Sequence, residues 1–126
     1  MGFDIYGIKT KSEKGEYFRN NVWGWRPLMR LIVFVYPNLT DKQIMNLSMN
    51  NGARFNHAFA DKLAKDLKEV LADEKTFKIV HRSIMDSLEV HSAGGENWYK
   101  CGLDEFKENV QNFAEFCENS GGFEVC

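Results

Sequence analysis

The residue types best suited to ligand chemistry gather between positions 16 and 28, where aromatic rings, guanidinium groups and carboxamides are interleaved. A guanidinium group donates paired hydrogen bonds to a phosphate or a carboxylate. An indole ring offers a flat surface for stacking, worth about 1–3 kcal/mol per base in sites for single-stranded nucleic acid. A carboxamide both donates to and accepts from the edge of a base. The candidate ligand-binding residues in this stretch are Arg19, Asn20, Asn21, Trp23, Trp25 and Arg26.

The backbone conformation of this stretch decides which of these side chains face the same way. Alternate side chains of an extended segment share a face. Four would then lie together: Arg19, Asn21, Trp23 and Trp25. Gly24 lets a ligand approach the backbone closely, and a helix that begins near Pro27 directs free N–H groups at an anion. The stretch therefore predicts a site for a nucleotide-like or other anionic ligand.

The same residues also have a purely structural interpretation, which is the more common one for aromatic side chains. Tryptophans of small proteins often anchor a core or an interface. Arg26 then lies on an indole face as a cation–π pair, and Asn20 with Asn21 forms a turn. A further hypothesis is a protein-interaction module, in which exposed aromatic residues bind a partner or a second copy of the chain.

An enzymatic role requires a different set of residues. Asp4, Glu13 and Glu16 fall within one expected hairpin, and two or three such carboxylates are able to hold Mg²⁺. The alternative hypothesis is a metal-dependent phosphodiester or nucleotide hydrolase that uses Asp4 and Glu16. The sequence contains no GxxxxGK[ST], GxSxG, HExxH or CxxC motif. A non-catalytic protein with no cofactor and no metal site is therefore the leading expectation.

Length and composition indicate one domain of the ordinary globular class. The chain has 126 residues, of which 44% are hydrophobic and 13% aromatic, and its formal net charge is −2. That charge excludes bulk coating of nucleic acid. Residues 1–38 have six Lys and Arg against three Asp and Glu, whereas residues 104–126 have one Lys against six Asp and Glu. The two ends either complement each other or leave a place for an anion to dock.

Cysteine content and hydropathy predict a cytoplasmic protein with no membrane association. The three cysteines lack close spacing, which argues against a disulfide framework and for a reducing compartment. The longest apolar run, Leu31 to Tyr36, is far shorter than the about 20 residues that span a bilayer. The N-terminus also lacks the basic and apolar segments of a signal peptide.

Hydrophobic periodicity predicts an α+β fold in a single domain. Alternation predicts strands at 3–8 and 16–22, which pair as a hairpin. Pro27 suits the first turn of a helix, so a helix is expected at 27–36. The pattern of residues 31–36 fits a buried strand as well as it fits a helix, and this alternative stays open.

The middle of the chain predicts helices. Thr40 and Gln43 match a capping box ahead of a short helix that runs to about Met49. Apolar stripes place two longer helices at 57–72 and 77–89.

The C-terminal part predicts a last helix and a returning strand. Residues 97–101 are expected to form a short extended piece, and Asp104 is the expected N-cap of the last helix. Gly121 and its neighbouring glycine end that helix, and residues 123–126 return as a possible edge strand. Four or five helices then pack on a small sheet. The N-terminal hairpin forms this sheet, together with the C-terminal strand if residues 123–126 are extended.

Both ends of the chain resemble a family of small proteins encoded by tailed bacteriophages and prophages. The resemblance rests on MGFDIYG at residues 1–7, on GEYFRNNVWGWRPL at residues 15–28, and on the segment from Glu108 through the ENSGGFE ending at Glu124. The family pattern has a tryptophan at the position of Gly24 and an aromatic residue at that of Met29. The family supplies no catalytic residues to transfer.

The resemblance implies a biological setting rather than a reaction. Small phage accessory proteins without enzyme motifs often act by binding, including on host defence systems. The expectation is therefore a phage-type accessory binding protein in the host cytoplasm. Its partner would be a nucleotide-like or other anionic ligand, or a host defence protein, bound through residues 16–28.

Overall fold

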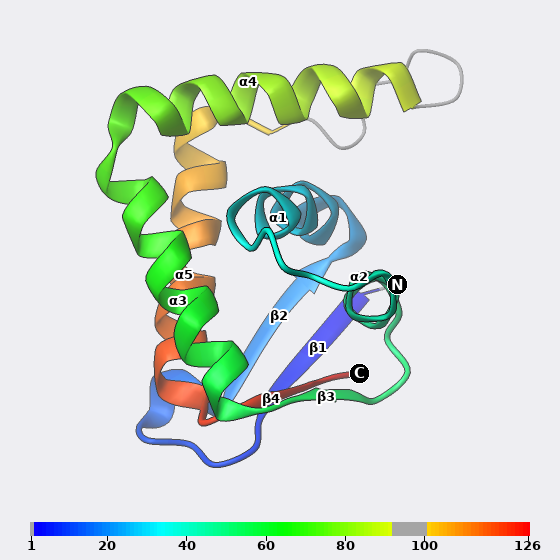
Figure 1. Ribbon diagram of the computed structural model, residues 1–126, viewed down its shortest axis with the longest axis vertical. Coiled ribbons are helices and arrows are strands. Elements are labelled where there is room, and N and C mark those ends of the chain that lie inside the picture. The colour runs from blue at the N-terminus through cyan, green and yellow to red at the C-terminus, as the bar shows by residue number, and fades with distance from the viewer. Residues whose placement is uncertain (1, 92–100) are drawn as a thin grey trace.

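The computed structural model describes residues 2–91 and 101–126, and in these ranges the chain forms an α+β fold (Figure 1). The strands are β1 (Gly2–Gly7), β2 (Tyr17–Asn21), β3 (Ala53–Phe55) and β4 (Phe123–Val125). The helices are α1 (Val22–Val35), α2 (Asp41–Ser48), α3 (His57–Ala72), α4 (Glu74–His91) and α5 (Leu103–Ser120). A 3-10 turn, Glu13–Gly15, precedes β2.

The described strands form one antiparallel sheet in the order β2-β1-β4-β3. The predicted N-terminal hairpin is confirmed, with Asp4 opposite Arg19 and Tyr6 opposite Tyr17. The C-terminal strand is also confirmed, but its expected place at an edge is wrong, because β4 pairs with β1 on one side and β3 on the other. The sequence did not indicate β3, since three residues are too few to show a period of two.

Helices cover one face of the sheet, and the aromatic core lies on that side (Figure 1). α1 lies between the sheet and α4, while α3 and α5 run side by side beside them. Rings of the sheet pack on rings of α5, with centroids 5.1 Å apart for Phe18 and Phe113 and 6.0 Å apart for Phe123 and Phe116. The opposite face of the sheet carries exposed side chains such as Tyr6.

Helix α1 begins at Val22, so the prediction of a helix start at Pro27 is wrong. The cause is a cap at Asn21, whose side-chain oxygen accepts the Gly24 N–H at 2.9 Å and satisfies a free donor of the first turn. Pro27 therefore lies inside the helix. The open alternative for residues 31–36 is resolved, because α1 continues through Val35.

The middle helices follow the predictions closely. The capping box of α2 is present, and α3 has the predicted bounds. α4 begins at Glu74, three residues before the predicted start at 77. Asp73 explains the earlier start, since its carboxylate accepts the Thr76 N–H at 3.1 Å and the Thr76 hydroxyl at 2.8 Å.

Helix α5 begins one residue after Gly102, so the prediction of Asp104 as N-cap is wrong. Asp104 lies in the first turn, where its negative charge favours the positive end of the helix dipole. Gly121 ends the helix with φ of 66°, a conformation that favours glycine, and this confirms the predicted stop. The extended piece expected at 97–101 falls outside the described residues except for its last position.

Candidate functional site

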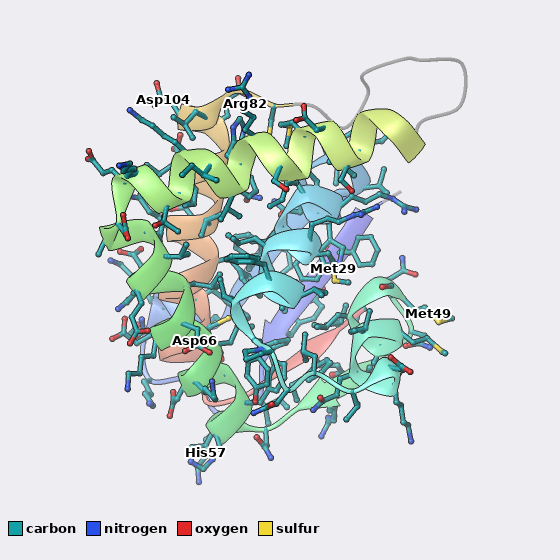
Figure 2. All side chains as sticks on the ribbon, turned by 45° about the horizontal axis from the view of Figure 1, so that its top comes forward. Met29, Met49, His57, Asp66, Arg82 and Asp104 are labelled. Carbon is teal, nitrogen blue, oxygen red and sulfur yellow. The ribbon has the colours of Figure 1, made fainter. Side chains whose placement is uncertain are left out.

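A pocket of about 300 Å³ lies where α1 meets α2, α4 and the first residues of β1. This volume is at the lower end of the range for sites that hold small molecules. Met29, labelled in Figure 2, projects from α1 on the side of α2. The described lining consists of Phe3, Trp25, Arg26, Met29, Arg30, Val33, Ile44, Ser48 and Leu88.

One face of α1 supplies most of this lining. Residues three or four positions apart share a face of a helix. The α1 side chains that border the pocket in this way are Arg26, Met29, Arg30 and Val33. Leu28 and Ile32 lie on the other side and are fully buried in the core. The cap at Asn21 sets where α1 begins, and so it determines which residues reach the pocket.

Two arginine side chains of α1 border the pocket. Arg26 and Arg30 are one turn apart on α1, and both border the pocket. Arg30 donates a hydrogen bond from Nη1 to the Ser87 Oγ on α4 at 2.7 Å. Because this partner is a neutral hydroxyl, the contact orients the guanidinium without neutralising its charge. No carboxylate occurs among the described lining residues. The arrangement suits an anionic group at the mouth and an apolar group below it.

The two tryptophans of the predicted site lie in different environments, because residues 23 and 25 are helical. The expected extended face shared by Arg19, Asn21, Trp23 and Trp25 is therefore wrong. Trp25 is 1% exposed and donates from Nε1 to the Leu47 carbonyl at 2.8 Å. Its ring is stacked on Phe3 at 5.4 Å. Trp23 is 44% exposed and does not border the pocket.

Arg19 lies away from the pocket, on the exposed face of the sheet. Its Nη1 is 2.7 Å from Asp4 Oδ1, and the same oxygen accepts the Tyr17 hydroxyl at 2.5 Å. The Tyr17 hydrogen bond, followed by that of Arg19, lowers the pKa of Asp4 below its ordinary value of 3.8. Donation to this carboxylate raises the pKa of Tyr17. The guanidinium of Arg19 thus stabilises the hairpin through an internal ion pair.

The two predicted asparagines have structural partners. The Asn20 carboxamide exchanges hydrogen bonds with that of Asn109 on α5, at 2.9 and 3.0 Å. Asn109 also donates to the Gly24 carbonyl at 3.4 Å. Asn21 is the N-cap of α1. These contacts join β2, α1 and α5, and neither carboxamide borders the pocket.

The acidic residues of the hydrolase hypothesis are dispersed. Asp4 forms the cluster with Tyr17 and Arg19, while Glu16 lies at the end of the 3-10 turn, before β2 begins. In the described part of the chain, no three His, Cys, Asp or Glu side chains are grouped so that they could hold a metal ion. The charge asymmetry of the chain is partly internal, since Lys14 pairs with Glu115 of α5 at 3.4 Å.

Of the six predicted site residues, the structure brings Trp25 and Arg26 to the pocket and places the other four elsewhere. Sequence reasoning missed Arg30, which supplies the second charge. The signal was present in the spacing of Arg26 and Arg30, four residues apart with Met29 between them. That spacing has meaning only if the helix already includes residue 26, and the expected start at Pro27 excluded it.

The protein has no match among protein-family models, curated proteins or solved structures. No helix within residues 2–91 and 101–126 has both the length and the apolar character needed to cross a membrane.

Proposed function

We propose that this protein is a non-catalytic binding protein that holds a small organic anion in the α1 pocket. The observation that carries the proposal is the pair Arg26 and Arg30, one turn apart at the rim of a pocket with an apolar floor. Guanidinium groups form strong, directional hydrogen bonds with carboxylates and phosphates. The apolar floor removes the remainder of the ligand from water.

The chemistry of the lining favours binding over turnover. Ser48 supplies a hydroxyl, but the described lining contains no imidazole or carboxylate to activate it as a nucleophile. The lining otherwise offers positive charge and apolar surface, which are groups that bind and orient a ligand.

The proposed setting is the cytoplasm of a bacterial host. The resemblance of both chain ends to small phage proteins supports an accessory role in infection. In that role the protein sequesters a small anionic signal or blocks a host defence protein, and in either case it antagonises defence by binding.

The test is calorimetric titration of the purified protein with inorganic phosphate, AMP and octanoate, which differ in the group attached to the anion. Arg30→Gln removes a charged hydrogen-bond donor. It is expected to lower the affinity for the tightest-binding probe by about ten- to a hundredfold. Arg82→Gln is the matched control, because Arg82 is an exposed arginine on the far side of α4 from the pocket (Figure 2). Failure of all three probes to bind, or equal losses in both variants, contradicts the proposal.

A second candidate function is protein binding where α1 crosses α4. Phe34 and Ile79 are 59% and 62% exposed, and both border a hollow of about 370 Å³ with a mostly apolar lining. Exposed apolar side chains grouped in this way are typical of interaction surfaces. Sedimentation velocity tests self-association by this surface. A concentration-dependent dimer that Phe34→Ser abolishes supports it, and a strict monomer at high concentration excludes it.

A further inference from the structure

Neutral polar side chains are scarce among the described residues that line the α1 pocket, and this bears on the chemistry of the ligand. Recognition of a nucleobase requires donors and acceptors that match its edge. The carboxamides nearest in sequence, Asn20 and Asn21, bind Asn109 and the Gly24 N–H instead. Apart from the two arginines and Ser48, the described lining residues are apolar.

Stacking of a base is also disfavoured by the geometry. A stacking platform needs an open ring face, and the indole of Trp25 is almost fully buried. It is stacked on Phe3 with an interplanar angle of 22° and meets Phe113 edge-on. Trp25 therefore contributes a wall of the pocket rather than a surface on which a second ring lies.

The size of the pocket gives an independent limit. One water occupies about 30 Å³ in the liquid, and a comparable share for each heavy atom means that 300 Å³ holds about ten of them. Octanoate has about that number, whereas AMP has roughly twice as many. The flexible Met29 side chain and the partly exposed Val33 suit a conformationally mobile chain, since methionine adapts to irregular apolar shapes.

We propose that the α1 pocket binds a free medium-chain carboxylate, with the carboxylate on Arg26 and Arg30 and the alkyl chain along Met29, Val33 and Leu88. This inference rests on the proposed function and specifies the ligand class of the same site. Arg30 borders both this pocket and the neighbouring hollow between α1 and α4, where its guanidinium donates to Ser87. The chain replaces water on the apolar floor.

The test is a homologous series of straight-chain carboxylates from butyrate to decanoate, titrated by calorimetry into the full-length protein. Burial of each methylene is expected to tighten binding by about fourfold. The gain is expected to stop near octanoate, where the pocket is full. Val33→Ser is expected to weaken the binding of octanoate several-fold and that of butyrate little. Ile79→Ser is the control, because Ile79 is an exposed apolar residue of α4 that does not border this pocket.

The outcomes separate this inference from the proposed function. Affinity that is independent of chain length, or AMP that binds more tightly than octanoate and is lost in Arg30→Gln, overturns the carboxylate assignment and leaves an anion-binding protein. No binding of any carboxylate, phosphate or AMP overturns both. Chain-length dependence that is reduced in Val33→Ser and unchanged in Ile79→Ser supports the assignment.

Discussion

Replacement of Trp25 by phenylalanine tests the central packing of α1. The indole Nε1 donates to the Leu47 carbonyl at 2.8 Å, near the C-terminal end of α2. The last carbonyls of a helix have no partner within the helix, so this donor satisfies a group that is otherwise unpaired and buried. Phenylalanine keeps an aromatic ring beside Phe3 and Phe113 but removes the donor and part of the ring volume.

The expected loss of stability follows from these two changes. A buried acceptor left without its donor costs about 1–3 kcal/mol. The missing ring atoms correspond to one or two methylene groups, at about 0.8 kcal/mol each. The sum is about 2–5 kcal/mol. With an unfolding entropy of about 2.1 cal/mol/K per residue, the melting temperature of a chain of this length falls by about 8–18 °C.

Differential scanning calorimetry and urea denaturation measure this loss, with Trp23→Phe as the matched control. Trp23 is 44% exposed, so the same substitution there is expected to cost less than about 1 kcal/mol. The reasoning is refuted if both variants lose similar stability, since that is the result expected when the two rings share one environment. It is also refuted if Trp25→Phe melts within 2–3 °C of the wild type, a shift of less than about 1 kcal/mol.

Two further predictions concern the hairpin and its contact with α5. Because the pKa of Asp4 is lowered in the folded state, its stabilising effect is present above pH 3.8 and is lost as the pH falls below that value. The difference in melting temperature between wild type and Asp4→Asn should therefore be steady above about pH 5 and shrink as the pH falls below 3.8. A difference that stays constant over that acid range contradicts the ion pair. Asn109→Ala removes both hydrogen bonds to the part-buried Asn20 and should cost about 1–2 kcal/mol in urea denaturation. Asn112→Ala, exposed on the same helix, is the control, and an equal loss there contradicts the role of the amide pair.

Local sequence signals predicted most of the fold, because most helices and strands have a recognisable capping residue, an apolar pattern along one face or a terminating residue in their own sequence. The bounds of α3 follow directly from its apolar positions, and the capping box at Thr40 identifies α2. The error with the largest effect on the site occurred where one residue serves two elements. Asn21 ends β2 and caps α1 with no linker between them, and a pattern based on alternation extends the strand through such a junction.

The candidate site was predicted less well than the fold for the same reason. Extended and helical backbones bring different side chains together. The wrong backbone conformation after Asn21 therefore led to the wrong set of side chains on one face. Arg19 and Asn20 also have partners from distant parts of the chain, Asp4 and Asn109, which no local pattern reveals. Chemical type identified the correct stretch of sequence, but tertiary contacts decided which of its residues border a pocket.

The position of β4 between β1 and β3 has a kinetic consequence. Ile5 pairs with Val125, so segments more than a hundred positions apart must meet before the two central strands pair with each other. Rates of folding fall as the sequence separation of contacts grows, because loop closure precedes the stabilising interactions. β3 contacts the other described strands only through β4. Formation of the β1–β4 pair is therefore expected to be slow relative to that of the β1–β2 hairpin. Displacement of β4 would separate β3 from the rest of the described sheet.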